Sequence, residues 1–158
     1  MNSHSPSNAT STRTPAIAAW LGGLGLVPFI ALTLVWIVGG PHLPFDPGRA
    51  LLVYGAVILS FLGGIHWGIA LRPGPSEHED HPLFSQSLII GVLPSIVGWV
   101  ALLGPMRIAI ALLCAGFVVQ LWVDLRTVSA GHFPKWFARL RIALTTIVLV
   151  SLLAAGLK

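Results

Sequence analysis

The sequence predicts an all-α fold, a polytopic membrane helical bundle with five transmembrane helices. Of its 158 residues, 55% are hydrophobic and only 9% are charged, whereas a soluble domain carries about 25% charged residues. The mean hydropathy is +0.86. Five separate apolar stretches approach the length of about 20 residues that a helix needs to cross the hydrocarbon core. These observations exclude an ordinary water-soluble globule.

The elements follow from the apolar stretches and the breakers between them. Residues 1–15 are rich in Ser, Thr, Asn and Pro, a composition that predicts a disordered N-terminal tail. Residues 16–158 are expected to form one five-helix transmembrane domain. Its helices are expected at about 16–38, 50–71, 84–103, 106–125 and 140–157. Glycine and proline mark each connection, and the shortest one, GPMR, predicts a tight hairpin between the third and fourth helices.

The basic residues predict how the bundle is oriented. Five spans place the two termini on opposite sides, and an excess of Lys and Arg marks the cytoplasmic side. Six basic residues fall on the side of the N-terminus and three on the other. The first group is Arg13, Arg72, Arg126, Lys135, Arg139 and Arg141, and the second is Arg49, Arg107 and Lys158. The N-terminus is therefore predicted to be cytoplasmic and the C-terminus to lie on the opposite side.

The second helix carries an unusual stretch, SFLGGIHWG, at residues 60–68. Residues four apart share a helix face, so a stripe of small residues is expected to pack against another helix. Its members are Ser60, Gly64 and Gly68, with Gly63 beside it. His66 lies about 200° around the helix from Gly64. Because a polar group facing lipid is costly, His66 is expected to face protein or water.

Four polar residues near the predicted cytoplasmic side are candidates for contact with a ligand or for a proton relay. They are His66, Gln120, Asp124 and Arg141. The His66 imidazole suits a proton relay because histidine titrates near neutral pH, but it also suits a simple interhelical hydrogen bond. Asp124 is expected either to pair with Arg139 or Arg141, or to stay solvated beside arginines that reach toward the interface.

Two prolines fall inside predicted spans, Pro28 in the first and Pro94 in the third. Each removes a backbone hydrogen bond and is expected to kink its helix. The segment VLPSIVGW around Pro94 is a candidate hinge or cavity wall. Plain packing of a kinked helix is the commoner explanation, because membrane helices tolerate proline well.

Several function classes lack their sequence signals. We find no nucleophile paired with a base and no zinc-hydrolase motif, so no catalytic residue is assigned and an enzyme is not predicted. His78 and His81 lie in the acidic segment SEHEDH, which indicates a solvated loop rather than a metal site. The single cysteine, Cys114, forms no intramolecular disulfide. The net charge of +4 is spread along the chain, so nucleic acid is not an expected partner, and no cofactor motif is present.

Three segments resemble the transmembrane protein 69 family, also called domain of unknown function 3429. They are YGAVILSFLGGIHWG, VLPSIVGW and FPKWFARLRIALTTIVLVSLL, and the resemblance extends from about Trp20 to the C-terminus. It implies a bioenergetic membrane: the inner membrane in bacteria, or the mitochondrial inner membrane in eukaryotes. It implies no catalytic residues, because the family has no established activity.

Two functions are expected from these features. The first is a non-enzymatic accessory or assembly component of a bioenergetic inner membrane, with the lipid bilayer and other membrane protein subunits as partners. The alternative is a small carrier or binder of a lipophilic or anionic small molecule, in which His66 and Asp124 contact the ligand.

Overall fold

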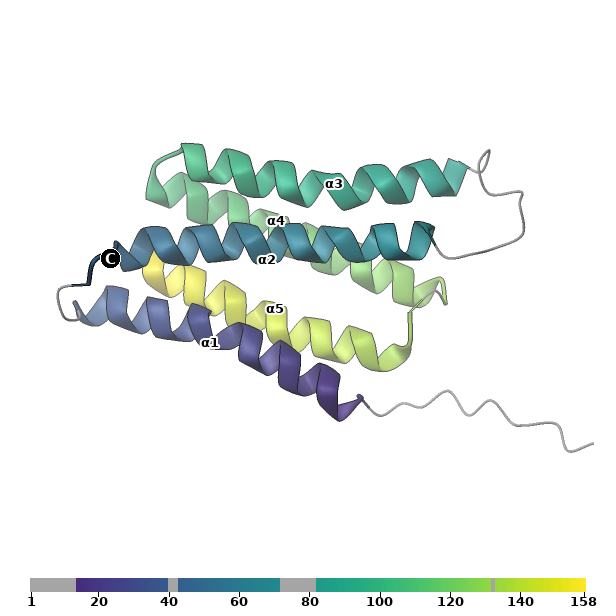
Figure 1. Ribbon diagram of the computed structural model, residues 1–158, viewed down its shortest axis with the longest axis horizontal. Helices are drawn as coiled ribbons and strands as arrows, with labels where there is room; N and C mark the ends of the chain where they lie inside the picture. The colour runs from purple at the N-terminus through teal and green to yellow at the C-terminus, as the bar shows by residue number, and fades with distance from the viewer. Residues whose placement is uncertain (1–13, 40–42, 72–81, 132) are drawn as a thin grey trace, which may run out of the picture.

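The computed structural model describes residues 14–39, 43–71, 82–131 and 133–158, and it confirms the all-α prediction. Five helices follow one another in this part of the chain, and no strand occurs in it (Figure 1). They are α1 (Ala16–Val38), α2 (Pro47–Ala70), α3 (Pro82–Leu103), α4 (Met106–Ser129) and α5 (Lys135–Gly156). The expected tail at 1–15 and the segment SEHEDH at 76–81 lie largely or wholly outside the described residues.

Most of the helices extend beyond the predicted apolar stretches. The bounds of α1 agree with the prediction, but α2 begins at Pro47 rather than residue 50, and α5 begins at Lys135 rather than residue 140. At α2, the Asp46 carboxylate accepts a hydrogen bond from the Arg49 backbone N–H at 3.0 Å, so an ordinary cap starts the helix before the apolar stretch. At α5, Pro134 precedes the first residue. Hydropathy locates the part of a helix that crosses hydrocarbon and misses its polar first turns.

Four helices of the described residues are long and apolar enough to cross a membrane. They are Ala16–Val38, Pro47–Gly68, Met106–Ser129 and Lys135–Gly156. In α3 the corresponding apolar helix is shorter, at Leu88–Leu103. The structure therefore supports a membrane bundle of five helices, and the number of five complete spans stays a prediction.

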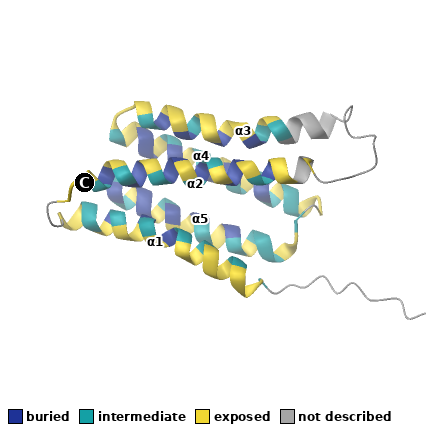
Figure 2. Ribbon diagram, viewed as in Figure 1, coloured by how far each residue is buried: buried dark blue, intermediate teal, exposed yellow. Residues whose placement is uncertain are grey.

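Burial follows a pattern suited to lipid (Figure 2). Large apolar side chains such as Trp20, Leu24, Val119, Trp122 and Leu153 are exposed on the outside of the helices. The interior holds a continuous core that includes Phe29, Leu51, Leu59, Leu113, Phe117 and Leu152. An apolar outer surface of this extent would aggregate in water, so the arrangement fits a hydrocarbon surrounding.

Helix α2 is central, as it contacts α1, α3 and α4. Its contact with α3 is the closest, because a Cβ atom added at Gly63 would overlap the Gly91 carbonyl of α3. Two turns away on both helices, a Cβ atom at Gly98 would lie 3.1 Å from the Ala56 side chain. The small residues therefore allow a close backbone approach, as expected for membrane helices.

Only part of the predicted group of small residues contacts another helix. Gly63 is buried against α3, whereas Gly64 and Gly68 are exposed and a Cβ atom at either would meet nothing within 4 Å. The Ser60 hydroxyl donates to the Ala56 carbonyl of its own helix at 2.9 Å. Within the described chain, Gly63 alone of the three glycines packs against another helix.

The two prolines lie inside helices, Pro28 in α1 and Pro94 in α3. The ring of Pro94 packs beside Gly63, where a Cβ atom would lie 3.0 Å from its Cγ. Gly91, Pro94 and Gly98 thus belong to the interface with α2, which favours the packing interpretation of VLPSIVGW over a hinge. In Figure 1, α1 bends along its length and its N-terminal half leads away from α2.

Candidate functional site

The structure brings together the four polar residues that the sequence singles out. His66 comes from α2, Gln120 and Asp124 lie one turn apart on α4, and Arg141 comes from the second turn of α5. All four are buried, with exposed fractions between 0% for Asp124 and 5% for Arg141. Side chains from three helices therefore form one polar cluster, which we call the His66–Asp124 cluster, inside an apolar bundle.

An ion pair forms the centre of the His66–Asp124 cluster. The Arg141 Nε donates to Asp124 Oδ2 at 2.6 Å. Arg139, the other predicted partner, is exposed on a different face of α5. The interpretation that Asp124 is solvated is wrong, because its exposed fraction is 0%. A buried carboxylate requires such a partner, since desolvation of an unpaired charge would cost several kcal/mol.

Gln120 connects the ion pair to the histidine. Its Nε2 donates to Asp124 Oδ1 at 3.1 Å and lies 3.5 Å from His66 Nδ1. The other ring nitrogen, His66 Nε2, lies 3.7 Å from Asp124 Oδ1. The cluster thus joins a carboxylate, a guanidinium, an amide and an imidazole from three helices.

Three buried polar atoms have no hydrogen-bond partner among the described residues. They are His66 Nε2, Arg141 Nη2 and Thr145 Oγ1. Thr145 lies one turn beyond Arg141 on the same face of α5 and is 1% exposed. Buried polar atoms without partners are uncommon in folded proteins and call for an explanation such as a bound molecule.

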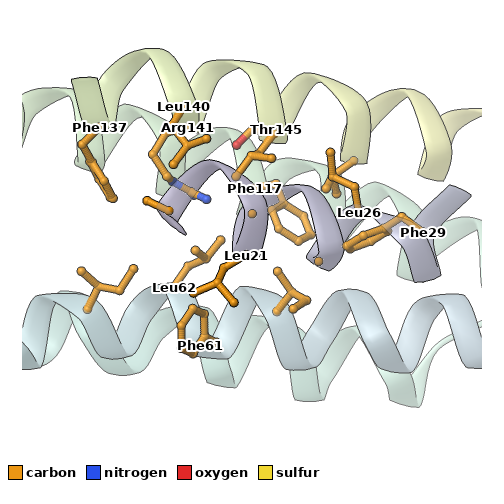
Figure 3. A pocket seen from close by; sticks show the side chains of 17 residues that line it. Leu21, Leu26, Phe29, Phe61, Leu62, Phe117, Phe137, Leu140, Arg141 and Thr145 are labelled. Atoms are coloured by element: carbon orange, nitrogen blue, oxygen red, sulfur yellow. The ribbon is translucent and has the colours of Figure 1, made fainter. Parts of the chain in front are cut away.

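A cavity of about 420 Å³ lies beside Arg141 and Thr145, between α1, α2 and α5. Figure 3 shows Arg141 and Thr145 on the α5 side of this cavity and Phe61 and Leu62 on the α2 side. Apart from these two polar residues its walls are apolar, with Leu26, Phe29, Phe117, Phe137 and Leu144 among them. This volume lies within the range of about 300–1,000 Å³ that is typical of small-molecule sites.

The mouth of the cavity lies on the outer surface of the bundle, between α1 and α2. Leu21 of α1 and Phe61 of α2 both line the cavity, and they are 63% and 67% exposed. Arg141 and Thr145, which also line it, are buried. The cavity therefore leads from the lipid-facing surface to the edge of the His66–Asp124 cluster.

Two aromatic rings, Phe133 and Phe137, lie next to His66. The ring of Phe133 meets His66 edge-on at a centroid distance of 6.3 Å and stacks on Phe137 at 4.5 Å. Phe137 in turn lines the cavity. The aromatic pair thus links the imidazole to the cavity wall.

The residues that the structure describes contain no group of three or more His, Cys, Asp or Glu side chains able to hold a metal ion. What these residues do place together is an ion pair and a histidine, buried beside an apolar cavity. Sequence analysis missed Thr145 and the cavity. The one available signal was the spacing of four residues between Arg141 and Thr145, which puts both on one helix face.

Comparison with known proteins places the chain in a family. The family model described as "Protein of unknown function (DUF3429)" matches residues 14–157. "Transmembrane protein 69" of Xenopus tropicalis is 34% identical over 143 residues, which cover 89% of this chain and 54% of that protein. "Transmembrane protein 69" of Mus musculus is 31% identical over 140 residues, with 87% and 54% covered.

The chain thus spans about half the length of these two relatives. No solved structure matches it. The resemblance drawn from the three sequence segments is confirmed by matches that reach from the beginning of α1 to the end of α5. This chain, an integral membrane protein, belongs to the DUF3429 family, together with the proteins named transmembrane protein 69.

Proposed function

We propose that this chain binds a lipophilic small molecule in the cavity between α1, α2 and α5, and that it does so without catalysing a reaction. The observation that carries the proposal is a cavity of about 420 Å³ whose lining residues are apolar apart from Arg141 and Thr145. Ligand sites commonly combine apolar walls with a few polar groups that fix orientation.

The size and opening of the cavity support this proposal over a packing defect. A volume of about 420 Å³ is large enough for a small molecule. The exposed side chains of Leu21 and Phe61 mark an entrance from the lipid-facing surface. A lipophilic molecule dissolved in the bilayer would reach the cavity sideways, without crossing water.

The proposed setting is a bioenergetic inner membrane, with five spans and a cytoplasmic N-terminus. The excess of basic residues at the N-terminal side supports this orientation. It places the ends of α2 and α4 and the beginning of α5, and with them the His66–Asp124 cluster, toward the cytoplasmic half of the membrane. The setting itself rests on the resemblance of the sequence segments to the family.

A substitution that fills the cavity tests the binding proposal. Gly25 lines the cavity and a Cβ atom there meets nothing within 4 Å, so Gly25→Leu adds a side chain without a clash at its root. Gly23→Leu is the matched control, because Gly23 has the same open space on α1 but lies outside this cavity. A diazirine-bearing alkane is cross-linked by light to the protein in lipid nanodiscs, and labelled peptides are counted by mass spectrometry.

We expect Gly25→Leu to remove labelling of the cavity-lining peptides of α1, α2 and α5, and Gly23→Leu to leave it unchanged. Equal labelling of the wild type and both variants would overturn the proposal. Thermal unfolding of each variant in the same nanodiscs shows that a loss of labelling does not come from a loss of fold.

An accessory or assembly role is the second candidate, and the open space at Gly64 and Gly68 favours it. These glycines and Ser60 lie on an outer face of α2 that the described chain leaves uncovered, and small residues allow close approach of another membrane helix. We expect Gly64→Leu to remove co-purifying subunits from protein extracted in mild detergent. An unchanged set of subunits in native mass spectrometry would exclude this face as the contact.

A further inference from the structure

We infer that the first half of α1, residues 16–27, is a gate for the cavity. This segment rotates about Pro28 and thereby widens or narrows the mouth between α1 and α2, and a hydrogen bond from Tyr54 of α2 holds it in the narrow position. The inference rests on the proposed binding function, and it adds the way in which a molecule enters from the bilayer.

The second half of α1, after Pro28, is fixed to α5. The Thr33 hydroxyl donates to the Ser151 carbonyl at 3.3 Å. One turn further on, the Trp36 indole donates to the Ala155 carbonyl at 3.1 Å. Two successive turns of this half are therefore bonded to the neighbouring helix, and it moves only if these bonds break.

The first half of α1 has looser contacts with the bundle. Leu26 is the one buried residue of positions 16–27, all of which the structure describes. Ile17 and Leu24, in contrast, are 71% and 59% exposed. Where this half does meet α5, Gly22 lies against the side chain of Leu144, a contact that a flexible side chain can follow or release.

Pro28 forms a joint between the two halves. A proline inside a helix removes the hydrogen bond to the carbonyl four residues earlier, here that of Leu24. Sharp kinks occur mostly at such positions, and α1 bends along its length in Figure 1. Gly23 and Gly25 lie just before the joint, and glycine is among the poorest helix formers. The helix is therefore easiest to bend at this point.

Tyr54 contacts α1 on both sides of the joint. Its hydroxyl donates to the Gly25 carbonyl at 3.0 Å, and its ring meets Phe29 edge-on at a centroid distance of 5.0 Å. Among the described residues, this is the one side-chain hydrogen bond that reaches the first half of α1 from another helix. Its loss would free the first half while the second half stays bonded to α5.

The half that moves is also a wall of the cavity. The α1 residues that line the cavity all lie between Ala18 and Phe29. At the mouth, Leu21 of α1 and Phe61 of α2 are the exposed lining residues (Figure 3). Rotation of the first half away from α2 therefore widens the mouth, whereas α2 itself stays packed against α3.

Distances between spin labels in lipid nanodiscs test the gate. One label is attached at Val57→Cys on α2, and the other at Ile17→Cys in the first half of α1 or at Ile37→Cys in the second half. All three positions are exposed, and Cys114→Ser removes the native cysteine. Ile17 lies about 16 Å along the helix from Pro28, so a change of about 20° in the kink displaces it by about 5–6 Å.

We expect two populations for the Ile17 pair, separated by this displacement, and one narrow population for the Ile37 pair. Tyr54→Phe should raise the ratio of the wide to the narrow position by about 3- to 10-fold, as the loss of one hydrogen bond allows. Pro28→Ala restores the missing backbone bond and should leave a single population. Pro94→Ala, in α3, is the matched control and should leave the Ile17 pair unchanged.

The outcomes separate the gate from the binding function. One narrow population for the Ile17 pair, in the wild type and in Tyr54→Phe, would overturn the gate. Equal broadening of the Ile17 and Ile37 pairs would also overturn it, because α1 would then move as one piece. Neither result touches the binding function, which fails only if Gly25→Leu leaves photolabelling of the cavity intact.

Discussion

Helix α2 meets its neighbours in two different ways. Toward α3 it presents Ala56 and Gly63 to Gly98 and Gly91, and the backbones lie so close that a Cβ atom at Gly63 would overlap the facing carbonyl. On another face it presents Leu62, Ile65 and the buried His66 toward a cavity of about 420 Å³ and the His66–Asp124 cluster. One helix thus carries both a tightly packed face and a face that borders open space.

The difference follows from the size of the side chains at each face. Small residues let the backbones of α2 and α3 approach closely. On the face toward α4 and α5, larger side chains and the buried Asp124–Arg141 pair lie between the helices. The cavity is lined by other residues of α2, among them Leu62 and Ile65, which do not take part in the close contact with α3.

Breaking the ion pair should have the largest effect. Asp124→Leu leaves the buried Arg141 guanidinium without its carboxylate, which should cost about 3–5 kcal/mol of unfolding free energy. The double variant Asp124→Leu with Arg141→Met removes both charges and should recover most of this loss. Thermal unfolding in detergent measures both. A double variant as unstable as the single one would show that the pair is not what holds this face together.

Overfilling the tight face should have the next largest effect. Gly63→Ala puts a methyl group against the Gly91 carbonyl of α3, and overpacking of this kind should cost about 1–3 kcal/mol. Gly64→Ala is the matched control, because it adds the same methyl group one residue away in open space. The same unfolding assay compares them. Equal stability of the two variants would contradict the close approach of α2 and α3.

The sequence predicts most of this architecture because its signals are local. Apolar stretches separated by glycine and proline reveal all five helices. His66, Asp124 and Arg141 stand out because an ionisable group in an apolar stretch is costly and needs a partner. Each of these signals depends on one segment read by itself.

The features that the sequence does not predict depend on which helices face each other. The spacing of four residues favours Gly64 as the packing residue, but the position of Gly91 on α3 gives that role to Gly63. Arg139 and Arg141 are likewise both near the beginning of α5, and the direction of Asp124 selects Arg141. Apart from its spacing of four residues from Arg141, Thr145 gives no signal, because a threonine on a membrane helix usually bonds its own backbone. The cavity depends on how α1, α2 and α5 lie beside one another.

The smallest effect we predict concerns the buried hydroxyl of Thr145. In protein freed of lipophilic ligand, Thr145→Val removes a buried hydroxyl that has no partner among the described residues, so it should raise the unfolding free energy by about 1 kcal/mol. Thr146→Val, whose hydroxyl donates to the Ile142 carbonyl and is exposed, should change it by less than about 0.5 kcal/mol. Unfolding in detergent measures this difference, and a loss of stability in Thr145→Val would mean that the chain itself satisfies the hydroxyl. A gain would mean that the buried hydroxyl destabilises the folded protein.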